Sequence, residues 1–462
     1  MAVAAPALAM TVVPNADSTS LGIGDKGWRM NDAVQNEFHG APAGEKPIVS
    51  IQRRHVIYVS GYDPRGAQSF FDLLRRTCER FCKLWPIGAT LQAIDMEADD
   101  IARWQLDLRA ADWQVATRYD FLRMEELIRA DMAQPMPRPF LRGLSWYADD
   151  IFSGTQFRIF RAAWRFAVHL LCFQLLILAW TATAIVAGFA ADRLLDAFGL
   201  PPVASIPIAI ALGATTLFAL RPLADRWRVV QIVSSWSTFR RFGRGRATWI
   251  DHAVERGARH LVAAARAGEA DEIALVGHSS GGSIACAIMA RALELDPELG
   301  RSGPRVVLLT LGSVMPAVAL HPAARHMRAI VARLATAQTI TWVDCQSRKD
   351  VMCFVDFDPV AGVGIKELGA ARRNPLLWRI SFKEAIAPEK YNEFSWNHFR
   401  IHYQYIMAGD RPAPYDYLLL VGGPMPVAEW PTRDREFFAA FLGCAAPGHG
   451  ERRNDAVIGA AS

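Results

Sequence analysis

The chain lacks the features that would place it in several common classes of protein. Its seven cysteines are an odd number, and none is spaced as CxxC or with the Cys/His spacing of a zinc site. Scattered thiols of this kind are typical of a reducing compartment. The first ten residues are apolar, but they have no basic segment and are short for a signal core. We therefore predict no cleaved secretory signal.

Nucleic-acid-binding motifs are also missing, although arginine is abundant in two places. The formal net charge is +5, and arginines gather at 142–165 and again at 221–246. These two clusters lie on either side of the most apolar part of the chain. Neither accompanies a recognised motif or a basic sheet interleaved with aromatic residues. We interpret the clusters as flanks of a membrane segment and predict no nucleic-acid partner.

What the chain has in excess is apolar sequence, with 52% hydrophobic residues and 14 tryptophans. The run 166–190 is almost free of charge, and a helix of about 20 residues crosses the ~30 Å hydrocarbon core of a bilayer. After a polar link and Pro201-Pro202, a second apolar run occupies 203–220 and is near the lower limit for a span. We predict a transmembrane hairpin at 161–225. The alternative is a buried helical cap over an active site.

The predicted membrane topology follows from charge. Both outer flanks of the hairpin are rich in arginine, whereas the link between its helices has Arg193 with Asp192 and Asp196. The positive-inside rule then places both flanks in the cytoplasm. The two parts of the chain on either side of the hairpin would share one compartment and could fold as one domain.

The rest of the chain is organised around a strand, a sharp turn and a helix. The apolar segment 273–276 precedes Gly277-His278-Ser279-Ser280-Gly281, and a helical pattern of small residues follows at 283–290. A serine can occupy a strained strand-to-helix turn only if its neighbours are small, which Gly277 and Gly281 are. The N-terminus of the helix would stabilise an anion beside Ser279. The alternative is a glycine-rich loop without chemistry.

This stretch resembles the nucleophile elbow of the α/β-hydrolase superfamily. The resemblance implies that the backbone N–H of Ser280 is one oxyanion donor. It places a second donor in the loop after an earlier strand, here His55–Ser60, which is followed by Gly61 and Tyr62. The donor would be the Tyr62 N–H. The family often has His-Gly where this chain has Ser60-Gly61, so an ordinary turn remains the alternative.

The same resemblance implies an acid and then a histidine after the serine. The loop after the strand at 305–311 contains no carboxylate, which excludes it as the source of the acid. Beyond the strand at 340–343, Asp350 lies in an Arg-Lys-Asp-Val setting similar to the family's acid turn. Asp344 is the alternative. Asp356 and Asp358 lie farther along and rank lower.

The general base is expected in the segment 395–405. Its two histidines, His398 and His402, are four residues apart on one helix face. That spacing can also chelate a metal, but no third ligand accompanies it, so we predict neither a metal nor a cofactor. His402, with Gln404-Tyr405 after it, resembles the family's His-x-x-Tyr arrangement. His398 is the alternative, and His278 is expected to shape the elbow.

The alternation of strands and helices predicts an α/β fold with a mostly parallel, doubly wound sheet, as in α/β hydrolases, interrupted by the two-helix hairpin. The expected segments are a disordered tail at 1–46, the first part of the hydrolase domain at 47–160, the hairpin at 161–225, the second part at 226–445 and a flexible tail at 446–462.

The expected function is that of a membrane-anchored serine hydrolase that cleaves an ester or thioester, with a lipid or acyl substrate suggested by the position of the hairpin. Ser279, His402 and Asp350 would form the triad. The lipid bilayer is the expected partner, with the catalytic domain on the cytoplasmic side. The alternative is a catalytically silent hydrolase fold that acts as a membrane interaction or scaffold module.

Overall fold

A computed structural model describes residues 51–96, 100–135, 137–246, 248–393 and 397–433. The predicted tails at 1–46 and 446–462 lie outside these residues. The described part contains one eight-stranded sheet with the order β2-β3-β4-β1-β5-β6-β7-β8. Its strands are β1 (Arg53–Val59), β2 (Gly88–Leu91), β3 (Ile101–Arg109), β4 (Gln114–Leu122), β5 (Glu272–His278), β6 (Arg305–Leu311), β7 (Thr341–Ser347) and β8 (Leu376–Ile380).

Most of the sheet is parallel, which confirms the predicted class of mixed α/β fold. Strand β1 pairs in parallel with β4 on one side and with β5 on the other, and β5 to β8 continue in parallel. Strands β2 and β3 add an antiparallel edge. Strands from before and after the apolar hairpin therefore share one sheet, and β1 and β5 are neighbours although more than 200 residues separate them.

Two predicted elements are wrong in part. The sequence of 90–94 fits the fourth strand of a hydrolase sheet, but the strand found there, β2, lies at the edge, and β4 is the neighbour of β1. The sequence from Tyr119 to Met132, with its repeated charges, predicts a helix with a solvated face. Instead β4 continues to Leu122, because its side chains alternate into the core beside β1 and β3, and helix α3 begins only at Glu125.

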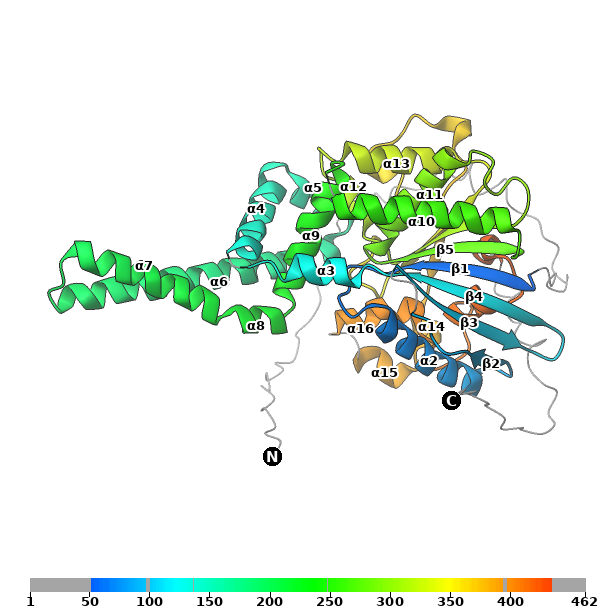
Figure 1. Cartoon of the computed structure of the whole chain (residues 1–462), viewed down its shortest axis with the longest axis horizontal. Coiled ribbons are helices and arrows are strands. Elements are labelled where there is room, and N and C mark those ends of the chain that lie inside the picture. Colours follow the sequence, from blue (N-terminus) through cyan, green and yellow to red (C-terminus); the bar gives the residue numbers. More distant parts are fainter. Residues whose placement is uncertain (1–50, 97–99, 136, 247, 394–396, 434–462) are drawn as a thin grey trace, which may run out of the picture. The chain divides into compact units, whose positions relative to one another are not determined.

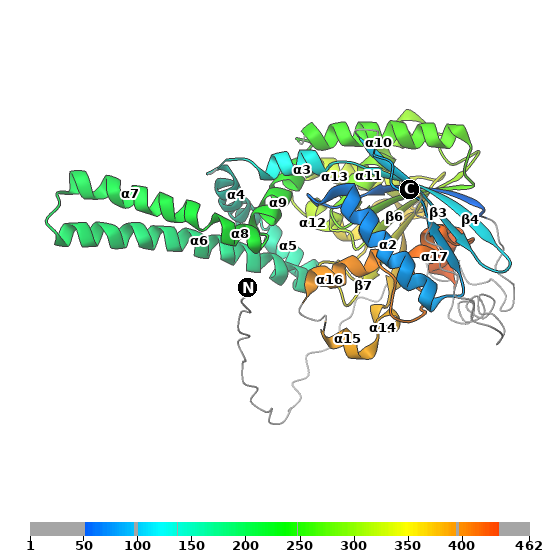
Figure 2. The same ribbon diagram turned by 60° about the horizontal axis from the view of Figure 1, so that its bottom comes forward.

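Both faces of the sheet are covered, and successive residues of its central strands enter different cores. Ile57 and Val59 of β1 pack on one face, whereas Val56 and Tyr58 pack on the other. This period of two, apolar on both faces, is what a buried parallel strand requires. Figures 1 and 2 show the helices on the two sides: α10 (Thr248–Ala267), α11 (Gly281–Leu295) and α13 (Arg325–Thr336) on one, and α2 (Gly66–Leu84) and α17 (Tyr417–Gly422) on the other.

A buried ion pair joins the amino ends of β1 and β5. The Arg54 Nε donates to Glu272 Oε1 at 2.8 Å, and both side chains are almost completely buried. The rest of the guanidinium donates to the carbonyls of Gly423 and Met425. The Val427 N–H donates to the same carboxylate. The pair therefore ties the C-terminal segment to the middle of the sheet.

Two of the helices are long and apolar enough to cross a membrane by length and composition. They are α6 (Trp164–Ala197), with a mean hydropathy of 2.2, and the helical segment Pro202–Arg226, with 2.0. The latter contains α7 (Pro202–Ala219) and α8 (Arg221–Arg226). The α6/α7 contact is close at two small residues. A Cβ on Gly188 would lie 2.9 Å from the Ala209 carbonyl oxygen, and one on Gly213 would lie 3.0 Å from that of Ala184.

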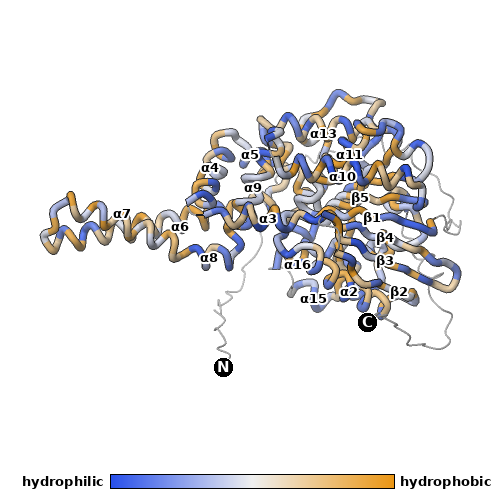
Figure 3. Tube along the Cα trace, in the orientation of Figure 1, coloured by the Kyte–Doolittle hydropathy of each residue, from blue (hydrophilic) through white to orange (hydrophobic). Residues whose placement is uncertain are grey.

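Many apolar side chains of this hairpin are exposed. Figure 3 shows that much of the tube of α6 and α7 has the orange of hydrophobic residues. In the 18-residue apolar stretch of α6, only 28% is buried. In the corresponding stretch of Pro202–Arg226, only 11% is buried. A helical cap buried on the sheet would hide these side chains, so their exposure argues against such a cap. The beginning of α6 differs, because Phe166 and Leu170 are buried in the same core as Ile57 and Val59 of β1.

Two further groups of helices lie beside the hairpin and near the carboxyl edge of the sheet. The helices beside the hairpin are α4 (Arg138–Phe152), α5 (Thr155–Ala162) and α9 (Val229–Gly243). Those near the carboxyl edge of the sheet are α12 (Met315–Ala319), α14 (Phe382–Ala385), α15 (Pro388–Glu393) and α16 (His398–His402). Helix α16 is five residues long and ends at the predicted base.

Candidate active site

Ser279 stands on a strained turn between β5 and α11. Its φ is +60°, a conformation that non-glycine residues rarely adopt. The turn is possible because the residues two positions before and after Ser279 are glycines, and a side chain at either position would clash with its surroundings. A Cβ on Gly277 would lie 2.7 Å from the Ala285 side chain, and one on Gly281 would lie 2.3 Å from the Val59 carbonyl oxygen. The small residues of the motif are therefore required by the geometry that was predicted for them.

The turn lies at the carboxyl edge of the parallel strands, where open α/β sheets bind ligands. The Ser279 N–H donates to the carbonyl of Leu311, the last residue of β6, at 3.0 Å. The carbonyl of Ser279 accepts from Gly282 and Val314. The backbone of the serine is thus fixed by its own helix and by the neighbouring strand.

The structure brings the predicted acid and base together. His402 Nδ1 and Asp350 Oδ2 are 2.7 Å apart, and both side chains are buried. The other carboxylate oxygen accepts from the Met352 N–H at 2.9 Å. His402 Nε2 has no hydrogen-bond partner among the described residues. A neutral imidazole that donates its Nδ1–H to Asp350 carries an unprotonated Nε2, which is the form a general base needs.

His278 supports His402 through the backbone. The His278 Nε2–H donates to the carbonyl of His402 at 3.0 Å, and the two ring centroids are 4.8 Å apart. Burial and then the nearby His402 lower the pKa of His278 to about 3. His278 is therefore neutral near pH 7, and it holds the end of α16 against the elbow.

Ser279 and His402 line the same cavity, which has a volume of about 420 Å³. Its apolar walls come from the sheet, from α2 and α9, and from the first turns of α6, where Phe166 and Leu170 take part. The described lining residues include one aspartate, Asp63, and four arginines. The arginines are Arg65, Arg76, Arg228 and Arg400.

The predicted oxyanion loop lies against the elbow. The Tyr62 N–H donates to Ser280 Oγ at 2.9 Å. The Tyr62 carbonyl accepts from Gln231 Nε2 of α9 at 2.9 Å, and its hydroxyl donates to Asp131 Oδ2 of α3 at 2.6 Å. Burial and the bond to Asp131 raise the pKa of the Tyr62 phenol. Asp131 also accepts from Thr238, so side chains of α3 and α9 fix the position of the loop.

The two alternative residues have other partners. Asp344 accepts from Thr310 Oγ1 at 2.5 Å and from Gln346 Nε2 at 2.8 Å, and burial raises the pKa of its carboxyl. His398 Nδ1 lies 3.2 Å from Nδ1 of His169 in α6. His398 is therefore next to the hairpin, whereas His402 is next to Asp350.

One group of side chains has the composition of a metal site. Ligand atoms of His55, Asp120 and His260 lie within 4.8 Å of one another. However, each imidazole Nε2 is hydrogen-bonded to the Asp120 carboxylate, at 2.9 and 2.7 Å, and Arg103 and Arg118 bond it as well. Two guanidinium groups already balance the carboxylate and would repel a cation. Hydrogen bonding of a buried carboxylate accounts for the cluster.

Sequence reasoning missed several residues that position the site. Asp131 and Gln231 hold the Tyr62 loop, and His169 contacts His398. Each lies far along the chain from its partner, and no local motif marks any of them. The one available signal was that polar residues such as His169 are rare in an apolar run.

Comparison with known proteins gives no match. No family model matches the chain, and neither a curated protein nor a solved structure does. The described residues therefore establish the fold alone. It is a mixed α/β fold with a mostly parallel eight-stranded sheet and two candidate membrane helices.

Proposed function

We propose that the protein is a membrane-anchored serine hydrolase with an α/β-hydrolase fold, which cleaves an ester or thioester. The observation that carries this proposal is the combination at one cavity of a strained Ser279 and an imidazole, His402, whose Nδ1 is bound to the buried Asp350. Serine needs a base of this kind to become a nucleophile, and the base needs an acid to fix its tautomer.

In the proposed reaction, Ser279 Oγ attacks the substrate carbonyl while His402 Nε2 takes the hydroxyl proton. The proton then passes to the leaving alcohol or thiol, whose bond to the acyl carbon breaks, and an acyl-serine remains. Water, activated by the same imidazole, releases the acid and restores Ser279. Asp350 stabilises the imidazolium in both halves of the reaction.

The oxyanion of each tetrahedral intermediate would accept from the N–H groups of Ser280 and Tyr62. The Tyr62 N–H now donates to Ser280 Oγ, so this hydroxyl has to turn away when substrate binds. The N-terminus of α11 adds a favourable partial charge at the same point.

The composition of the cavity supports an amphiphilic substrate. Aromatic and aliphatic side chains form most of its wall, and α6, which begins the membrane hairpin, contributes Phe166 and Leu170. An acyl chain could therefore reach the serine from the bilayer. Four lining arginines against one aspartate favour a substrate that also has an anionic group.

We propose that α6 and α7 cross the bilayer and that both arginine-rich flanks lie in the cytoplasm. Protease accessibility of these flanks tests the topology, in sealed right-side-out vesicles whose lumen corresponds to the cytoplasm. Protection of both flanks supports it, and digestion from outside contradicts it.

A fluorophosphonate probe on the full-length protein in detergent tests the activity. We expect labelling of the wild type and none of Ser279→Ala. Ser283→Ala is a matched control, because Ser283 is buried in the helix directly after the elbow and should not affect labelling. If the folded wild type is not labelled, a scaffold function is favoured instead.

A second comparison tests the base. His402→Ala should abolish turnover of a short-chain ester, whereas His398→Ala should keep most of it, because His398 contacts His169 instead of the acid. Loss of turnover only in His398→Ala would contradict the assignment.

A further inference from the structure

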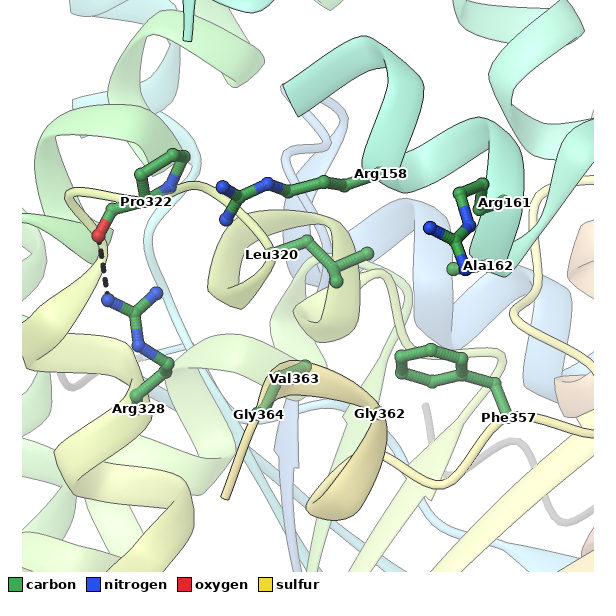
Figure 4. Close-up of a pocket in the computed structure, with 10 residues that line it drawn as sticks. All are labelled: Arg158, Arg161, Ala162, Leu320, Pro322, Arg328, Phe357, Gly362, Val363 and Gly364. Carbon is green, nitrogen blue, oxygen red and sulfur yellow. Dashed lines mark hydrogen bonds between the residues drawn. The ribbon is translucent and has the colours of Figure 1, made fainter. Parts of the chain in front are cut away.

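A second cavity, of about 650 Å³, lies between α5 and the segments around α12 and α13, away from Ser279. Figure 4 shows arginines on two sides of it, with Arg158 and Arg161 from α5 and Arg328 from α13. Its apolar surface comes from Leu320, Phe357 and neighbouring small residues. A cavity of this size that combines arginine side chains with an apolar surface fits an amphiphile.

No carboxylate of a described residue neutralises the arginines of this cavity. The ten described lining residues include no carboxylate, and neither Arg158 nor Arg161 forms a salt bridge with any described residue. The Arg328 guanidinium donates to the carbonyls of Ala319, His321 and Pro322, at 2.7 to 2.8 Å. These bonds fix its position but do not neutralise it.

Several arginine side chains lie close to one another at this cavity. Burial, and then Arg158 and Arg325, lower the pKa of Arg328. Bringing cations together costs free energy unless an anion joins them. Arginine is the side chain best suited to a phosphate group, because its planar fork can donate two hydrogen bonds to it.

The cavity also lies next to the membrane hairpin. A single residue separates the end of α5, at Ala162, from the start of α6, at Trp164. On this segment three large aromatic side chains are exposed: Phe157 by 64%, Phe160 by 51% and Trp164 by 60%. Exposed aromatic residues alternating with arginines are typical of a helix that lies in the headgroup region of a bilayer.

We propose that this cavity binds the headgroup of an anionic phospholipid. The phosphate would lie between Arg158, Arg161 and Arg328, and the glycerol with the first methylenes would cover Leu320 and Phe357. A free phosphate ion offers the same anionic chemistry, but it would leave the apolar surface and the exposed aromatic side chains unused. The proposal requires α6 and α7 to be in the bilayer and is independent of hydrolase activity.

The test is native mass spectrometry of the full-length protein in a nonionic detergent, titrated with phosphatidylglycerol or phosphatidylcholine of the same chain length. We expect the first lipid to bind more tightly than the second. Arg158→Gln/Arg161→Gln should weaken phosphatidylglycerol binding at least about tenfold, because each lost charge-assisted hydrogen bond is worth about 1.5 kcal/mol or more. These two exposed arginines are chosen because Arg328 bonds three carbonyls and its loss could unfold the protein.

The matched control is Arg75→Gln/Arg109→Gln, which removes two exposed arginines from α2 and β3 and the same charge. It should leave lipid binding unchanged, and so should Ser279→Ala, which separates this proposal from the hydrolase. Equal binding of both lipids, or no effect of the α5 double variant, would overturn the proposal. Inorganic phosphate that binds as tightly as phosphatidylglycerol would show a soluble-anion site instead and would overturn the lipid source.

Discussion

Replacing Asp350 by asparagine is the sharpest test of the proposed chemistry, because it changes one buried group without changing its volume. The Asp350 carboxylate accepts from two sides, from His402 Nδ1 at 2.7 Å and from the Met352 N–H at 2.9 Å. An amide has only one accepting oxygen. In one orientation its NH₂ faces the imidazole, and in the other it faces the Met352 N–H.

Both orientations are unfavourable. If the NH₂ faces His402, the imidazole has to accept at Nδ1 and carry its proton on Nε2, which is the wrong tautomer for a base. If the oxygen faces His402, two donors meet at Met352. The wrong tautomer lowers kcat about 10⁴-fold in Ser-His-Asp enzymes, which corresponds to about 5 kcal/mol of activation free energy. We expect Asp350→Asn to lose activity by a factor of this order.

The assay is the rate of ester hydrolysis per folded molecule, with the folded fraction measured by thermal unfolding. Asp344→Asn is the control, because this carboxyl is also buried but is held by Thr310 and Gln346. It should reduce stability and leave the rate per folded molecule unchanged. An Asp350→Asn enzyme that stays within about tenfold of the wild type, or a loss of rate confined to Asp344→Asn, would refute the reasoning.

Three further predictions concern stability. Arg54→Leu leaves Glu272 as an unpaired buried charge and should lower the free energy of unfolding by about 3–5 kcal/mol in a denaturant titration. Burial raises the pKa of Asp416 from 3.8 to about 6, so the stability that its protonated form contributes is full well below pH 3.8 and is lost as the pH rises through 6. Between pH 4 and pH 7 the free energy of unfolding should therefore fall by about 2 kcal/mol more in the wild type than in Asp416→Asn. Gly213→Leu places a side chain against the Ala184 carbonyl and should lower the melting temperature in detergent; an unchanged value would contradict the α6/α7 contact.

The local features of the site could be predicted from the sequence because short-range physics determines them. Residues 273–276 are apolar without interruption, as a strand buried on both faces must be, and Gly277 and Gly281 are the residues that a turn at Ser279 tolerates. The same holds for the two apolar runs that form α6 and α7, where length and hydropathy suffice.

Features that depend on distant partners could not be predicted in this way. The segment that forms β2 has the composition of a strand, but its place at the edge depends on pairing with β3. His398 and His402 lie one turn apart in α16, so their spacing fits either as the base. The difference comes from the neighbours, since His398 meets His169 of α6 and His402 meets Asp350.

The first turns of α6 contact residues of the candidate site directly. These contacts give a physical reason for the insertion of the hairpin between β4 and β5. The Arg165 guanidinium, at the start of α6, donates to the Arg348 carbonyl in the loop before Asp350 at 2.5 Å. One turn later His169 contacts His398, and Phe166 and Leu170 form part of the cavity wall. A membrane anchor joined by a linker would need none of these contacts. Because α6 contacts the loop before Asp350, the segment of His398 and the cavity wall, we expect a shift of the first turns of α6 to change the shape of the cavity.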